Sequence, residues 1–277
     1  MFHQPCLKAD ETLYGFVAET YKIDKLIVAD KLDNQQQFAS KWVVQQSKID
    51  DSLTRYAKIE SGKLQVQDPR GTTIWFKQKF EGSIMISYKV TAPLAFTKGN
   101  DIMPRDINQF WMANTPTDIN VYAKGGLFDS TKYNGEFKPY DDLLTYYAST
   151  GGGNLTTNNR TVRMRRYPRS INGKLADHLG LNNRDDDTNF LIVPDKEHTI
   201  QLVAANDIVQ YIFDGKVVYE LKLGSEVNVF NDASKNVTKS IWGNAPFTFY
   251  NSGYFGFRLT RTHHNYSDFK VYGLLKK

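Results

Sequence analysis

The chain has 277 residues and a formal net charge of +5, with 40% apolar and 23% charged residues. Sandwiches and barrels often reach ~200 to 250 residues without dividing, so we expect one domain over residues 1–277. The modest charge and scattered acidic residues exclude a polybasic nucleic-acid arm, and the single cysteine, Cys6, excludes an internal disulfide and a cysteine-based zinc site.

The amino-terminal residues, MFHQPCLKADETLYGF, lack a charged start followed by an apolar run. No later window holds the ~18 consecutive apolar residues that a membrane span requires. We therefore expect a soluble monomer or dimer without a membrane span. Two locations stay open: a periplasmic or secreted protein whose leader has been replaced by Met1, or a cytoplasmic protein.

Strand-like runs separated by turn signals recur along the chain, and no long stretch has a helical period. After a polar lead segment, the pattern predicts strands over residues 63–67, 73–80, 83–91, 107–113, 120–126, 199–204, 208–213 and 216–221, and two closing strands in GYFGFRLTRTHHNYSDFKVYGLL. Asp214 and Gly215 predict a tight hairpin turn. Residues 224–246 are polar and are predicted to be irregular. We predict an all-β fold, an antiparallel two-sheet sandwich of the concanavalin-like jelly-roll type.

Residues 146–167, YYASTGGGNLTTNNRTVRMRRY, have the composition of an anion-binding surface. Alternation along a strand places Arg163, Arg165 and Tyr167 on one face and Arg166 on the other. Arginine offers a planar donor fork that matches carboxylate and sulfate. This face is therefore a candidate site for an acidic ligand, with a solvated strand as the alternative.

Two residues on earlier strands are further candidates. Alternation within residues 73–80 places Trp75 on the polar face beside lysines, where its ring is a candidate platform for a sugar. Burial of that ring beneath a loop is the alternative. Asn108, in the strand predicted over residues 107–113, is expected on a working face.

Histidine is scarce, and His263 and His264 lie close to Arg258 in the penultimate predicted strand. They are candidate proton-transfer groups. Straight alternation favours His264 as the exposed residue. A twist or bulge after Leu259 would instead turn His263 toward a cleft. A purely structural histidine is the alternative to either.

Arginine, tyrosine and histidine without paired carboxylates are the groups needed for β-elimination on a uronic acid. Arginine or amide donors neutralise the C6 carboxylate and acidify the C5 proton, which a tyrosine or histidine removes. Tyr146 and Tyr147 are the candidate tyrosines. This reaction requires no cofactor. The acidic stretch NNRDDDTNF, residues 182–190, leaves a structural calcium open, but it lacks the glycine and glutamate of the helical calcium motif and is better interpreted as a solvated loop.

Two other classes of function stay open. A glycan-binding module would use the same basic and aromatic cleft without forming a product. A glycoside hydrolase needs two carboxyl groups that flank the bond, with Asp106 or Glu60 as distant candidates, and no such pair is evident in the sequence.

Motifs along most of the chain resemble those of a bacterial family of concanavalin-like β-sandwich domains encoded among polysaccharide-utilisation genes. They are KWVV, IESGKLQV, TIWFKQKFEG, DINQFWMA, YYASTGGGN, TVRMRRY and GYFGFRLTRTHHNYSDFKVYGL. The family pattern has residues that match Asn108, Trp111, Arg163, Arg165, Arg166 and His263. The resemblance thus favours His263 over His264. It also implies glycan breakdown, because the family is similar to jelly-roll polysaccharide lyases and to an oligosaccharide dehydratase of ulvan degradation.

These observations predict a carbon-oxygen lyase that removes water from the non-reducing-end uronic acid of ulvan-type oligosaccharides, with chain-cleaving lysis as the alternative. Its partner is an acidic oligosaccharide. The expected roles are charge neutralisation by Arg163 and Arg165 with Asn108, proton transfer by His263 with Tyr146 or Tyr147, and substrate contacts by Trp75, Trp111, Arg166, Tyr167 and Arg258. No metal ligands are assigned.

Overall fold

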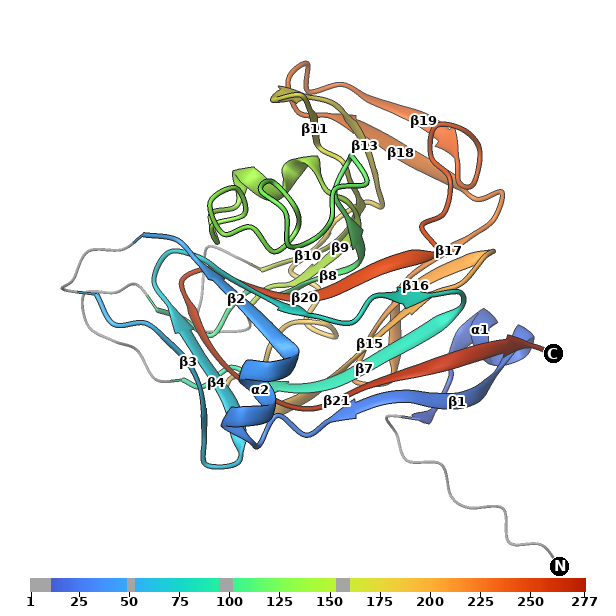
Figure 1. Cartoon of the computed structure of the whole chain (residues 1–277). Coiled ribbons are helices and arrows are strands. Elements are labelled where there is room, and N and C mark those ends of the chain that lie inside the picture. Colours follow the sequence, from blue (N-terminus) through green and yellow to red (C-terminus); the bar gives the residue numbers. More distant parts are fainter. Residues whose placement is uncertain (1–10, 49–52, 95–101, 153–159) are drawn as a thin grey trace, which may run out of the picture.

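The structure, a computed structural model, describes residues 11–48, 53–94, 102–152 and 160–277. Over this part of the chain two antiparallel sheets stack face to face (Figure 1), which confirms the predicted all-β sandwich. Among these residues no helix is long and apolar enough to cross a membrane. Cys6 lies outside the described residues.

One layer, the back sheet, contains eight strands. They are β1 (Tyr21–Asp30), β3 (Tyr56–Glu60), β4 (Lys63–Asp68), β7 (Ile84–Thr91), β15 (Glu197–Ala204), β16 (Ile208–Phe213), β17 (Lys216–Lys222) and β21 (Thr262–Lys276). Their order is β17-β16-β15-β7-β21-β4-β3, and β1 pairs with β21. The first and last described strands therefore lie side by side.

The other layer, the front sheet, contains eleven strands. They are β2 (Trp42–Gln46), β5 (Thr72–Phe76), β6 (Phe80–Glu81), β8 (Ile107–Asn114), β9 (Leu144–Thr150), β10 (Thr161–Arg166), β13 (Asp177–Gly180), β14 (Arg184–Asp185), β18 (Glu226–Asn231), β19 (Val237–Ile241) and β20 (Ser252–Leu259). The main order is β19-β18-β13-β10-β9-β8-β20-β5-β2, with β14 beside β10 and β6 beside β20.

The remaining elements are short. They are the helices α1 (Gly15–Thr20) and α2 (Gln35–Lys41), the 3-10 helix η2 (Lys138–Asp142), and a separate hairpin of β11 (Ser170–Ile171) and β12 (Lys174–Leu175). In Figure 1 the green segment before β9, which includes η2, lies over the outer face of the front sheet. We call residues 115–143 the cover.

Alternation along the strands builds two separate aromatic layers. Ile74 packs in the core between the sheets, whereas its neighbour Trp75 belongs to a second cluster on the outer face of the front sheet. Phe110 and Tyr147 join that second cluster from β8 and β9, and Tyr140 joins it from the cover. Aromatic packing therefore holds the cover against strands β5, β8 and β9. The neighbouring strands β10, β13 and β18 are the next part of the front sheet.

Most predicted strands agree with the structure within a few residues. The predicted turn at Asp214 and Gly215 is confirmed, because both residues have positive φ, 49° and 74°, and they connect β16 to β17. Two-residue hairpin turns of this mirror-image kind fit the right-handed twist of the flanking strands.

Two segments were predicted wrongly. Residues 120–126 form successive turns and no strand, because the amide of Ala123 bonds to the carbonyl of Asn120 and the amide of Gly126 bonds to the carbonyl of Ala123. Conversely, the polar segment 224–246 contains β18 and β19. Strand β19 lies at the edge of the front sheet, where side chains stay in water and no apolar alternation is required.

Candidate functional site

A pocket of about 190 Å³ lies on the outer face of the front sheet, where β9, β10, β13 and β18 are neighbours (Figure 1). We call it the arginine pocket. Its walls combine cationic, aromatic and titratable side chains from segments that are far apart in the sequence. The lining residues are Phe137, Tyr147, Arg163, Arg165, Tyr167, Arg169, His178, Phe230 and Asp232.

The floor of this pocket follows from strand alternation and register. Arg163 lies opposite Ser149 of β9, and Arg165 lies opposite Tyr147. Because opposite residues of paired strands share a face, both arginines and Tyr147 point to the outer side of the sheet. The structure therefore places Arg163, Arg165 and Tyr167 on one face of the sheet, as alternation along TVRMRRY predicts.

Arg165 is held by several fixed contacts. Its guanidinium donates to the carbonyl oxygen of Leu181 at 2.9 Å and to Oδ1 of Asn183 at 2.6 Å, and it lies 4.7 Å from the ring centre of Phe230. Burial lowers the pKa of Arg165, and the nearby charge of Arg163 acts in the same direction. Arg165 thus contributes a fixed positive charge to the pocket wall.

Arg169 bridges two carboxylates at the other end of the pocket. Its Nε donates to Oδ2 of Asp232 at 3.0 Å, and its Nη1 donates to Oδ1 of Asp141 at 3.2 Å. Asp232 is the one carboxylate among the lining residues, and Arg169 neutralises it. The three arginines therefore leave the pocket with a net positive charge.

Arg163 differs from the other two arginines. Its Nε is buried and has no hydrogen-bond partner within the described parts of the chain. Burial raises the pKa of the adjacent Tyr147 hydroxyl, and the charge of Arg163 partly opposes that rise. A buried donor without a partner calls for an explanation, and an anionic ligand that accepts from it supplies one.

His178, Arg169 and Asp232 line the pocket but were not predicted from the sequence. His178 and Asp232 reach it because β13 pairs with β10 and β18 pairs with β13, whereas Arg169 lies in the short segment that follows β10. Nothing in the local pattern of the segments SINGKLADHLGL or NDASKN indicates that pairing. The scarcity of histidine is the signal that could have indicated His178.

The side chain of Arg165 lies against Gly180, in space that a larger residue would occupy. A substitution at Gly180 therefore tests the role of Arg165. A Cβ atom on Gly180 would lie 2.6 Å from Cδ and 2.8 Å from Nη1 of Arg165, which is closer than real contacts allow. We expect Gly180→Ala to displace Arg165 and to weaken binding of an acidic ligand roughly tenfold, about 1.4 kcal/mol, as measured by calorimetric titration. Gly273→Ala is the matched control, since its Cβ would approach no atom closer than 3.7 Å. Equal affinity of the two variants would argue against a role for Arg165.

Among the other predicted site residues, Tyr167 and Asn108 share this face of the sheet. Tyr167 lines the pocket and packs against Tyr147, with ring centres 5.6 Å apart. Asn108 lies opposite Ser149, which in turn lies opposite Arg163. Its Oδ1 is buried and has no partner in the described structure. Asn108 therefore lies in the same row of residues as Arg163, one strand beyond the pocket lining.

Three predicted residues lie on the opposite side of the front sheet. Tyr146 and Trp111 pack together in the core between the sheets, with ring centres 5.3 Å apart. Arg166 faces the same side, where its Nε donates to the carbonyl of Thr248 at 2.9 Å and its guanidinium lies 4.0 Å from the ring centre of Tyr250. None of the three lines the arginine pocket, so the site proposed below does not include them.

Trp75 and Arg258 are on the outer face but lie beneath the cover. Trp75 is 0% exposed, and its Nε1 donates to Oε1 of Gln45 at 2.9 Å. A sugar platform needs an open ring face, so this arrangement matches the alternative of burial beneath a loop. Arg258 is 1% exposed and donates to backbone carbonyls, including that of Gly135 in the cover.

The two neighbouring histidines lie near the start of β21 in the back sheet. The alternation that favoured His264 as exposed is wrong, because the chain turns at Arg261, with φ of 52°, between β20 and β21. His264 is fully buried and contacts the Tyr266 hydroxyl and the Arg105 carbonyl, both at 2.9 Å. His263 is half-buried, 3.5 Å from the Tyr56 hydroxyl, and burial lowers its pKa. It does not line the arginine pocket.

The acidic stretch 182–190 uses its carboxylates within the protein. Asp185 accepts a hydrogen bond from Thr161, Asp186 pairs with Arg160, and Asp187 pairs with Arg184. Within the described ranges, no group of three or more histidine, cysteine, aspartate or glutamate side chains could hold a metal ion.

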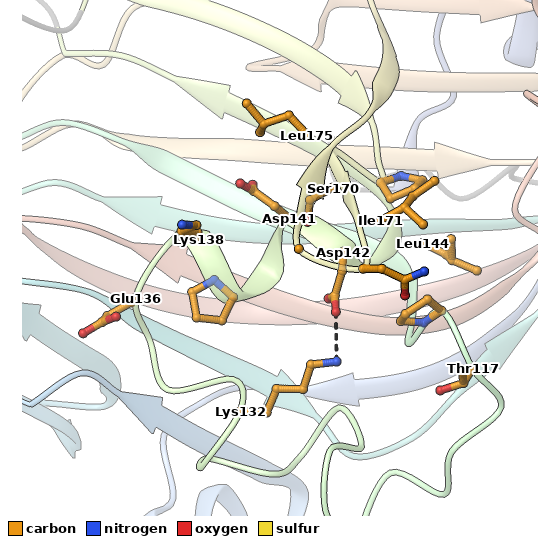
Figure 2. Close-up of a pocket in the computed structure, with 15 residues that line it drawn as sticks. Thr117, Lys132, Glu136, Lys138, Asp141, Asp142, Leu144, Ser170, Ile171 and Leu175 are labelled. Carbon is orange, nitrogen blue, oxygen red and sulfur yellow. Dashed lines mark ion pairs between the residues drawn. The ribbon is translucent and has the colours of Figure 1, made fainter. Parts of the chain in front are cut away.

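A second pocket, of about 930 Å³, lies between the cover and the hairpin of β11 and β12 (Figure 2). Figure 2 shows Lys132 beneath Asp142, to which it pairs at 2.9 Å, and Ile171 of the hairpin among the lining side chains. Asp141 also lines this second pocket, and it accepts a hydrogen bond from Arg169, which lines the arginine pocket. These two residues therefore connect the two pockets. The lining of the second pocket contains no arginine or histidine, so it lacks the groups that distinguish the smaller pocket.

Residues 66–231 match a family described as a domain of unknown function, DUF6250. The chain belongs to this family. The matched segment includes β8, β9, β10, β13 and β18, and therefore the strands that carry the arginine pocket. The sequence matches no curated protein.

Several solved structures are similar to this chain at low sequence identity. A protein of unknown function with a galectin-like fold from Bacillus subtilis is 15% identical, with a TM-score of 0.58 over 93% of this chain and all of that one. The carbohydrate binding module CBM66 from Bacillus subtilis is 10% identical, with a TM-score of 0.46 over 84% of this chain and 96% of the module. A LamA variant from Z. galactanivorans, in complex with laminaritriose and laminaritetraose, is 12% identical, with a TM-score of 0.49 over 90% and 99%. The first of these likenesses shows a galectin-like jelly-roll sandwich.

Proposed function

We propose that the protein is a carbon-oxygen lyase that removes water by β-elimination from the terminal uronic acid of an acidic oligosaccharide. The observation that carries this proposal is the arginine pocket itself, a site of net positive charge. Here the Nε of Arg163, which has no hydrogen-bond partner among the described residues, lies beside Tyr147. A carboxylate is the ligand that such a site recognises best.

The chemistry follows from these two residues. The guanidinium of Arg163 neutralises the C6 carboxylate of the uronate, which lowers the cost of placing negative charge on C5 as its proton leaves. Tyr147 keeps its hydroxyl proton at neutral pH because burial raises its pKa. It is therefore suited to donate that proton to the oxygen that leaves C4.

The size of the pocket favours the end of a chain over its middle. Its volume of about 190 Å³ is smaller than the roughly 300 to 1,000 Å³ of sites for drug-sized ligands. One terminal sugar ring suits this space better than several consecutive rings. This supports release of water from a terminal residue over cleavage within a polysaccharide.

The carboxylates near the pocket do not favour hydrolysis. Asp232 is the one acidic residue in the lining, and it is bound to Arg169. Glycoside hydrolysis usually needs two carboxyl groups that flank the bond, one of which keeps its proton. Asp106 and Glu60 do not line this pocket. Ulvan-type uronates remain the favoured substrates because of the sequence resemblance described above.

The test is to mix the protein with uronate oligosaccharides from ulvan, alginate, pectin and glycosaminoglycans while recording the ultraviolet band of a 4,5-unsaturated uronate. Mass spectrometry of the products completes it. A rise in absorbance with loss of one water and no shortening supports the dehydratase, and a rise with shorter fragments supports a lyase. Saturable binding without any rise would replace both with a glycan-binding module.

A further inference from the structure

His178 lies across the arginine pocket from Tyr147. Tyr147 is on β9 and His178 is on β13, and β10 with Arg165 runs between them, followed by Tyr167. Two strand spacings and an offset of two residues separate their backbones by about 12 Å. A sugar ring bound over β10 would therefore have a titratable group on each side.

The imidazole of His178 is held in place by two aromatic rings. Its ring stacks on Phe230 with centres 5.8 Å apart and meets the edge of Tyr167 at 6.4 Å. Nδ1 is buried and has no hydrogen-bond partner in the described structure. When the proton of the neutral ring is on Nε2, Nδ1 therefore carries a lone pair that no described group uses. His178 is 3% exposed, so bulk water competes poorly for that lone pair.

We propose that Nδ1 of His178 is the base that removes the C5 proton of the uronate in the arginine pocket. This assignment rests on the proposed elimination and names a residue that the sequence reasoning did not consider. It replaces His263, which lies in the back sheet beside Tyr56 and does not line the pocket.

The charges around His178 keep it in the form that can accept a proton. Burial lowers its pKa to about 4, against the opposing charge of Asp232 and with the help of Arg169 and Arg165. Tyr167 is the remaining titratable group packed against the ring, and burial raises its pKa, so it is uncharged at neutral pH. His178 is therefore neutral, with a free lone pair, at any pH well above 4.

Asp232 is the competing base in this pocket, and its contacts argue against it. Burial would raise its pKa, but the hydrogen bond and charge of Arg169 outweigh burial and hold the pKa below its ordinary value. A carboxylate that is already bound to a guanidinium has little affinity for a proton. Asp232 is therefore not the group that takes the proton.

The elimination then balances as follows. The C5–H bond breaks and its proton forms a bond to Nδ1 of His178, while its electron pair becomes the second bond between C4 and C5. The C4–O bond breaks with its electron pair on oxygen, which takes the hydroxyl proton of Tyr147 and leaves as water. The protonated His178 and the phenolate of Tyr147 return to their starting forms through solvent.

The experiment compares His178→Asn with His263→Asn in the ultraviolet assay, after far-ultraviolet circular dichroism has shown that both fold. We expect His178→Asn to lower kcat at least ~100-fold with little change in substrate affinity, as loss of a general base does. The wild-type rate should fall on the acid side with a midpoint near pH 4, and this limb should disappear in the residual activity of the variant. If His178→Asn does not fold, the imidazole of His178 in the wild-type protein can be titrated by nuclear magnetic resonance, and its midpoint should match the acid limb of the rate.

The outcomes separate this inference from the proposed function. Loss of activity in His263→Asn alone, or an imidazole midpoint far from the acid limb, would overturn the role of His178 and leave the elimination standing. Absence of elimination by the wild-type protein on every uronate would overturn the proposed function and the role of His178 with it.

Discussion

Replacing Arg163 with glutamine should lower the rate of elimination by roughly 10² to 10³, the usual effect of removing one preorganised donor from a developing charge. The physical reason is that Arg163 is the arginine of the pocket whose buried Nε has no partner in the described structure, so it has a hydrogen bond available for the substrate carboxylate. The rate is measured from the ultraviolet band of the product. Thermal unfolding should be nearly unchanged, because no contact within the core is lost.

Two further variants show whether the loss of rate in Arg163→Gln comes from the shape of the guanidinium or from its charge. Arg163→Lys keeps the positive charge but loses the planar fork, and we expect it to recover only part of the rate. Lys174→Gln removes one charge from the exposed strand β12, away from the pocket lining, and should leave the rate unchanged. If Arg163→Gln and Lys174→Gln had equal effects, the arginine pocket would not be the site of reaction.

Part of the candidate site was predictable because alternation along a strand is a local property. The sequence TVRMRRY sets which of its residues share a face, and the structure indeed places Arg163, Arg165 and Tyr167 together, with Arg166 on the inner side. The same reasoning separated Trp75 from Ile74. It failed for His264, because alternation does not continue through the turn at Arg261.

The rest of the site depends on pairing between distant segments. His178 and Asp232 reach the pocket because β13 lies between β10 and β18, and that order is set by packing across the whole sheet. The exposed edge strand β19 gives no apolar alternation from which it can be recognised, and β18 offers only Val227 and Val229 in a polar surrounding. The position of the cover was also not predictable from the sequence. The cover buries Trp75 through an aromatic contact with Tyr140, and no local sequence pattern indicates which face of a sheet a loop will cover.

Arg258 raises a separate question, because the sequence placed it among the substrate contacts. Its Nη1 donates to the carbonyl oxygens of Thr72 at 3.1 Å, Gly135 at 2.5 Å and Leu259 at 3.1 Å. The guanidinium also lies 5.5 Å from the ring centres of Phe137 and Tyr140. These contacts join β20, the start of β5 and the cover. They favour a structural role in holding the cover against the sheet.

Arg258→Met should therefore reduce the free energy of unfolding by roughly 3 kcal/mol, because buried carbonyls that lose a donor cost about 1 to 3 kcal/mol each and methionine fills only the space. Urea unfolding measures the loss, and hydrogen exchange should show weaker protection of amides in the cover, such as those of Tyr140 and Leu143. The control is Arg70→Met at an exposed position, for which we expect a change within about 0.5 kcal/mol. A stable Arg258→Met protein that binds uronate poorly would restore Arg258 to the substrate contacts. It would also mean that the cover opens when substrate binds, since Arg258 is 1% exposed beneath it.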